Sequence, residues 1–190
     1  MTALVRLALG ALIAVGLLGR AHAQDEVAIE RELERYRAML KADPWSNPAL
    51  LDADKGEVLW KEKRGPRNVS LEGCDLGKGP GIVEGAFAEL PRYFKDAKRV
   101  MDAETRLVWC METLQGLPRA EILKRPVSKA NQQGTDLEAL STYLAVKSQG
   151  RVFAAPQAHA LERAAIELGE AAFFHRLGPM DFSCATCLGE

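Results

Sequence analysis

Two cysteines near the end of the sequence, Cys184 and Cys187, are separated by two residues. Thiols at this spacing lie on one turn of a helix, where each can add across one vinyl group of a haem. In such a site the next residue is a histidine, whose imidazole binds the iron. Here the next residue is Leu188. The spacing predicts covalent attachment of one haem c at the two cysteines, and the leucine supplies no axial ligand, so no protein ligand to a metal is assigned.

The first 23 residues have the features of an export signal. A positive charge at Arg6 is followed by the apolar run 7–18, and a small-residue triplet ends at Ala23. The run is too short to span a bilayer, so we expect a signal peptide at 1–23 and no membrane span. Removing it leaves 23 of the 25 basic residues against all 26 acidic ones, a net charge of −3. This balance argues against nucleic acid as a partner.

Export to an oxidising compartment, the periplasm in a bacterium, bears on the other two cysteines. Cys74 lies in a glycine-rich stretch, and Cys110 lies on the apolar face of an expected helix. We expect these two thiols to form a disulfide, which loop-entropy arithmetic values at about 3–4 kcal/mol. Two separate buried thiols are the alternative. A zinc site made from all four cysteines is disfavoured, because neither Cys74 nor Cys110 has a second cysteine a few residues away, as structural zinc sites usually do.

Hydrophobic periodicity predicts a mainly α fold. Helical spacing of apolar residues occurs in 29–40, 102–116, 135–150 and 158–174, whereas the proline- and glycine-rich stretch 45–81 is expected to be irregular. No strand-type alternation of any length is present.

Capping residues and apolar stripes refine three of these helices. Asp102 is expected to cap one helix, and Thr135 with Glu138 forms a capping-box pattern at the start of another. In the last helix the side expected to be buried carries Leu161, Ala165, Leu168 and Ala172.

The order of these parts resembles class I cytochrome c, in which an N-terminal helix, a haem-attachment loop and a crossing C-terminal helix form the domain. The helix at 135–150 is similar to a closing helix, and the helix at 158–174 with its following cysteine pair is similar to the entry of a second domain. We therefore expect a complete haem-less cytochrome c-like domain at 24–152. Residues 153–190 are then the start of a second, incomplete haem domain.

Motifs in the correct order over nearly the whole mature chain resemble the SoxA family. They are SLEGCDLGKGPG at 70–81, AELPRYF at 88–94, RLVWCM at 106–111 and MDFSCATC at 180–187.

The resemblance implies the catalytic cytochrome subunit of the periplasmic SoxAX complex, an L-cysteine S-thiosulfotransferase of sulfur-oxidising bacteria. That family oxidatively conjugates thiosulfate to a cysteine of the SoxYZ carrier, and the electrons leave through haem and the SoxX subunit. The implied partners are SoxX, SoxYZ and thiosulfate. The lone Cys74 is similar to one-haem members, whose first site has become a disulfide.

The resemblance assigns no catalytic residue to this sequence. The family's axial histidine corresponds to Leu188, and its ligating cysteine would lie beyond Glu190. We therefore expect a truncated chain that is inactive alone.

Other functions and ligands remain open at this point. One alternative is a non-catalytic module that docks a cytochrome partner, and another is a thiol-disulfide oxidoreductase that uses Cys184 and Cys187. Replacement of the axial ligand by His159 or His175 is a minor alternative to capping or surface roles. Met180 is expected to pack in the core.

Overall fold

The computed structural model describes residues 28–43, 47, 49–125, 127–129 and 134–188. The chain divides into two compact units, Met1–Pro48 and Ala49–Glu190. In the first unit residues 28–42 are helical, as the apolar spacing predicts. The expected signal peptide lies outside the described residues. The domain boundary expected near residue 152 stays a prediction.

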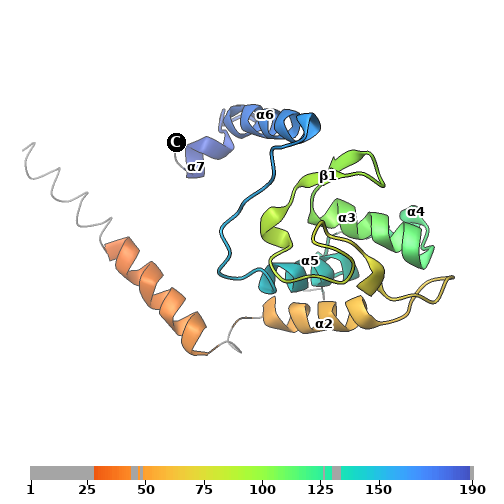
Figure 1. The fold of residues 1–190 in the computed structure, drawn as a ribbon. Helices are drawn as coiled ribbons and strands as arrows, with labels where there is room; N and C mark the ends of the chain where they lie inside the picture. Colours follow the sequence, from red (N-terminus) through yellow and green to blue (C-terminus); the bar gives the residue numbers. More distant parts are fainter. Residues whose placement is uncertain (1–27, 44–46, 48, 126, 130–133, 189–190) are drawn as a thin grey trace, which may run out of the picture. The chain divides into compact units, whose positions relative to one another are not determined.

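Two helices pack side by side in the second unit. They are α2, Ala49–Lys61, and α5, Asp136–Val146 (Figure 1). Their backbones approach closely at Gly56, where a Cβ atom would collide with the carbonyl of Ala139 and lie 2.7 Å from Cβ of Tyr143. The prediction of an irregular stretch is wrong for α2, because Gly56 serves close packing inside a helix and does not break it.

The cap predictions for the central helices are confirmed. Helix α3, Ala103–Cys110, begins after Asp102, whose carboxylate accepts a 2.7 Å hydrogen bond from the amide of Thr105. The helix continues as a π-helical turn, Met111–Gln115, and ends at Gly116 with φ of +75°. The short helix α4, Arg119–Ile122, follows.

At the start of α5 the predicted capping box is present. The hydroxyl of Thr135 accepts from the amide of Glu138 at 3.2 Å, and the carboxylate of Glu138 accepts from the amide of Thr135 at 2.6 Å.

A small antiparallel hairpin departs from the all-helical expectation. Strand β1, Arg92–Phe94, pairs with β2, Arg99–Met101, with Tyr93 opposite Val100. Strands of three residues are too short to produce a readable alternation, which explains why the sequence pattern did not indicate them. Two 3₁₀ turns, Leu71–Gly73 and Phe87–Glu89, complete the loops around the hairpin.

The last part of the unit holds α6, Ala160–Phe174, and the short α7, Cys184–Leu188. The expected buried side of α6 is wrong. Leu161 is 46% exposed and Leu168 is 72% exposed, while the buried residue of α6 is Glu162. Within the described ranges, no helix combines the length and hydropathy needed to cross a membrane.

The hydrophobic core forms between α2, α3, α5 and the loops that lead to the hairpin, and a mainly α fold is confirmed. Its fully buried side chains include Leu71, Leu76, Met101, Leu107, Leu140 and Leu144.

Candidate functional site

The cysteine pair lies on α7, whose first turn is fixed by its own side chains. The amide of Thr186 donates to Oγ of Ser183 at 3.3 Å, and the amide of Ser183 donates to Oγ1 of Thr186 at 3.1 Å. Reciprocal bonds of this kind hold a helix start in register. The chain reaches this turn through a β-bridge between Leu177 and Phe182.

Both thiols of the pair are free and exposed. Cys184, Cys187 and Leu188 are spaced i, i+3 and i+4, so they share one side of the helix. Two accessible thiols three residues apart fit covalent attachment of haem c. Leu188 is 77% exposed and has no lone pair, so position 188 does not fit as an iron ligand.

The structure places the residues considered as alternative iron ligands, and Met180, as follows. Nδ1 of His159 accepts a 3.1 Å hydrogen bond from the amide of Leu161, and its ring stacks on Tyr93 with centroids 3.8 Å apart. His159 is therefore a capping residue. His175 is exposed just after α6. Met180 is 68% exposed, so the expectation that it packs in the core is wrong.

A buried carboxylate connects α6 to the hairpin, and sequence reasoning missed it. Glu162 accepts a 2.8 Å hydrogen bond from the amide of Tyr93 and a 2.9 Å bond from the amide of His159. Burial opposes ionisation of Glu162, but the two amide donors outweigh it, so its pKa is lowered. The ionised Glu162 thereby holds the helix that leads toward the cysteine pair. The capping-box pattern formed by His159 and Glu162 could have indicated the hydrogen bond that Glu162 accepts from the amide of His159.

The predicted disulfide between Cys74 and Cys110 is present, with a Cα–Cα distance of 5.7 Å and a sequence separation of 36. Both cysteines are almost fully buried in the core. The bridge joins the loop after the first 3₁₀ turn to the end of α3. Because these two sulfurs bond each other, a zinc site of four cysteines is excluded.

The segment after Cys74 forms a closed turn. One carboxylate oxygen of Asp75 accepts from the amides of Gly77 at 2.6 Å and Gly79 at 2.9 Å. Gly77 and Gly79 have φ of +100° and +106°, a conformation that suits glycine. The loop is thus a compact structural element beside the disulfide.

A buried cation, Arg106, ties this loop to the hairpin turn. Its Nε donates to the carbonyl of Asp75 at 2.8 Å, and its Nη1 donates to the carboxylate of Asp96 at 2.8 Å. The guanidinium also lies 4.0 Å from the ring centroid of Phe94. Arg106 is only 3% exposed, so it organises the core and is not accessible to a substrate.

These features were compared with known proteins. Residues 55–153, the stretch that holds the second half of α2, the disulfide, the hairpin and α5, match the family described as SoxA/TsdA, cytochrome c domain. The chain belongs to the SoxA/TsdA cytochrome c domain family. The SoxA resemblance of the sequence motifs is thereby confirmed.

Curated SoxA relatives resemble the chain over most of its length. It is 45% identical over 166 residues to L-cysteine S-thiosulfotransferase subunit SoxA of Hydrogenophilus thermoluteolus, a match that covers 87% of this chain and 59% of the relative. It is 30% identical to a SoxA of Hydrogenobacter thermophilus over 94% of this chain and 63% of the relative. The chain thus spans about six-tenths of the length of these SoxA proteins.

A solved structure supports the SoxA fold. The crystal structure of SoxXA from P. pantotrophus aligns with a TM-score of 0.60 and 21% identity, over 79% of this chain and 52% of that one. The SoxA/TsdA cytochrome c domain implies a haem c cofactor. Cys184 and Cys187 lie outside the matched residues, and haem attachment there stays a prediction.

Proposed function

We propose that this chain acts as a SoxA-type cytochrome c subunit of an L-cysteine S-thiosulfotransferase. The family match and the 45% identity to a SoxA support the assignment. The observation that carries it is the pair of free, exposed thiols on one side of α7, in the arrangement that covalent haem attachment requires.

The proposed reaction joins thiosulfate to the carrier cysteine of SoxYZ. A sulfur–sulfur bond forms between the carrier's thiol sulfur and the outer sulfur of thiosulfate. The thiol loses its proton, two electrons leave, and the product is a cysteine S-thiosulfonate on the carrier. Haem c, when bound, supplies the redox group that accepts electrons and passes them toward SoxX.

The chain's own residues contribute attachment and positioning to this chemistry. Cys184 and Cys187 would hold the cofactor through thioether bonds. Glu162 fixes the preceding helix against the hairpin. Leu188 cannot ligate iron, so we place no catalytic residue within these 190 residues and expect no turnover by the chain alone.

The proposed setting is the periplasm, with SoxX as the electron-accepting partner. An oxidising compartment agrees with the disulfide that braces the core. The structural neighbour is named as a SoxXA complex, which supports a subunit of this type beside SoxX.

A second candidate function is a non-catalytic docking module. The observation that favours it is the exposed apolar surface of the last segment, where Phe153 is 74%, Leu168 is 72% and Leu177 is 67% exposed. Large exposed apolar side chains such as these offer contact points for a partner.

The test compares the chain with a chimaera that continues it with the remaining C-terminal part of the H. thermoluteolus SoxA. Each is made with haem-maturation machinery and mixed with SoxX, SoxYZ, thiosulfate and an electron acceptor, and the mass of the carrier is measured. We expect no adduct from the chain alone and a thiosulfonate adduct from the chimaera that carries Leu188→His. The chimaera that keeps Leu188 is the matched control, and we expect it to be at least tenfold slower.

Binding of SoxX without any adduct from the Leu188→His chimaera would favour the docking module. Failure of every version to bind SoxX or form an adduct would contradict the assignment.

A further inference from the structure

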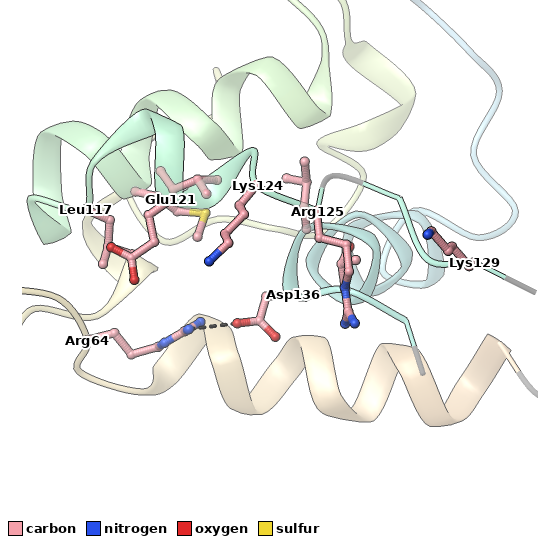
Figure 2. Close-up of a pocket in the computed structure, with 11 residues that line it drawn as sticks. Arg64, Leu117, Glu121, Lys124, Arg125, Lys129 and Asp136 are labelled. Carbon is pink, nitrogen blue, oxygen red and sulfur yellow. Dashed lines mark hydrogen bonds and ion pairs between the residues drawn. The ribbon is translucent and has the colours of Figure 1, made fainter. Parts of the chain in front are cut away.

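A cavity of about 700 Å³ opens in the second unit, away from the cysteine pair. It lies between the segment around α4 and the start of α5, with Arg64 at one side (Figure 2). This volume falls in the range of sites that hold organic ligands or several residues of a peptide. It is far larger than a single inorganic oxyanion requires.

Basic side chains outnumber acidic ones in the wall of the cavity. Lys124, Arg125 and Lys129 line it, and none of them forms an ion pair with another described residue. Figure 2 shows Lys124 and Arg125 extending from the α4 segment into the space above α2. Three cations gathered around one concave surface create a positive potential that attracts an anion.

The acidic residues of the cavity offset little of this charge. Asp136 is engaged by Arg64 at 2.7 Å and by Lys55 at 3.1 Å. Burial opposes its ionisation, but these two cations lower its pKa, so Asp136 remains a charged partner of Arg64 and Lys55. Glu121 is the other carboxylate in the lining, against three basic residues that have no such partner.

Part of the cavity wall is apolar. Met111, Leu117, Ile122 and Leu137 contribute to the lining, and Met111 and Leu137 belong to the buried core. A fully hydrated inorganic anion gains nothing from contact with these apolar residues, whereas an apolar side chain does. Apolar and cationic residues in one lining therefore match a ligand that carries both apolar and anionic groups.

We propose that this cavity binds an acidic peptide segment of a partner protein, with an apolar side chain against the apolar lining residues and carboxylates against Lys124, Arg125 and Lys129. The surface does not involve Cys184 or Cys187. The proposal therefore stands apart from haem attachment and from the proposed enzymatic function.

The test measures binding of a fluorescein-labelled eight-residue peptide of alternating glutamate and leucine to the whole chain by fluorescence anisotropy. The variant Lys124→Glu/Arg125→Glu is expected to weaken binding at least tenfold. A matched control, Lys95→Glu/Lys98→Glu, makes the same charge change at two exposed lysines of the hairpin turn and is expected to stay within twofold. Circular dichroism verifies that both variants are folded.

Two further probes separate the peptide from other anions. A glutamate–serine peptide lacks the apolar side chains and is expected to bind at least fivefold more weakly. Sodium thiosulfate is expected to displace the peptide no better than sodium chloride at equal ionic strength. Equal binding of the two peptides, selective displacement by thiosulfate, or equal effects of the two double variants would each overturn the proposal.

Discussion

The carboxylate of Glu162 accepts a hydrogen bond from the backbone amide of Tyr93, which lies 69 residues earlier in the chain. The same side chain caps its own helix through the amide of His159, and the ring of His159 stacks on Tyr93. One buried charge thus fastens α6 to β1. Glu162 is the buried residue of this helix, whose apolar residues Leu161 and Leu168 are exposed.

Replacing this charge with a neutral amide is expected to loosen α6. Glu162→Gln keeps the shape but weakens two charge-assisted hydrogen bonds, at a cost of about 1–2 kcal/mol. Hydrogen exchange followed by mass spectrometry should show faster exchange in peptides that contain Tyr93 and His159. Glu167→Gln, at an exposed position of the same helix, is the control and should leave that exchange unchanged. Identical exchange in the two variants would rule out the fastening role.

Adding one methyl group at the α2–α5 contact is expected to destabilise the core. In Gly56→Ala the new Cβ meets the backbone carbonyl of Ala139, which cannot move without shifting α5. Overpacking of this kind costs about 2–3 kcal/mol, measured as a lower free energy of unfolding in urea. Gly169→Ala is the control, because no atom lies within 4 Å of its Cβ position on exposed α6. That change should be neutral or gain about 0.5–1 kcal/mol.

Reduction of the core disulfide is expected to lower stability by about 3–4 kcal/mol, because opening the bridge frees a long loop in the unfolded chain. The experiment uses Cys184→Ser/Cys187→Ser, which leaves Cys74 and Cys110 as the only cysteines. Urea unfolding is followed with and without dithiothreitol, and thiol labelling verifies reduction. Coincident unfolding curves would show that the bridge does not brace the core.

Acid is expected to weaken the start of α5 through Glu138. Hydrogen bonds from the amide of Thr135 and then from the amide of Ser128 lower the pKa of Glu138 from 4.5 to about 2. Because the folded pKa is depressed, the stabilisation is complete above about pH 4.5 and is lost as the pH falls toward 2.

Thermal unfolding between pH 6 and pH 2.5 tests this dependence. Glu138→Gln should lose stability at pH 6 and show a shallower decline in acid than the unchanged chain. Glu104→Gln, exposed in the first turn of α3, is the control and should retain the full decline. If the melting temperature of Glu138→Gln falls with pH as steeply as that of the unchanged chain, this carboxylate does not link folding to pH.

Local signals in the sequence were sufficient for some parts of this structure. Asp102 and Thr135 were read correctly as caps, because an N-cap depends on neighbouring amides alone. The pairing of Cys74 with Cys110 followed from the inward face of Cys110 and the expected redox setting.

Long-range contacts explain what the sequence did not reveal. In the sequence Gly56 looks like a residue that breaks a helix. The structure shows instead that it allows the backbone of α5 to pack closely against α2. The periodicity of α6 shows an apolar stripe at Leu161 and Leu168 but not what covers it, and here both residues are exposed. Glu162 became a buried anchor only because the amide of Tyr93 lies opposite.

The central claim is that Cys184 and Cys187 carry a covalent haem in a SoxA-type subunit. It is tested most directly by expressing the chain with c-type haem-maturation machinery and mapping its peptides by mass spectrometry. We predict that the peptide containing residues 184–187 carries one haem, with single attachment in Cys184→Ala and none in the double alanine variant. Recovery of both thiols free and fully alkylated, with no haem on the chain, would contradict the account.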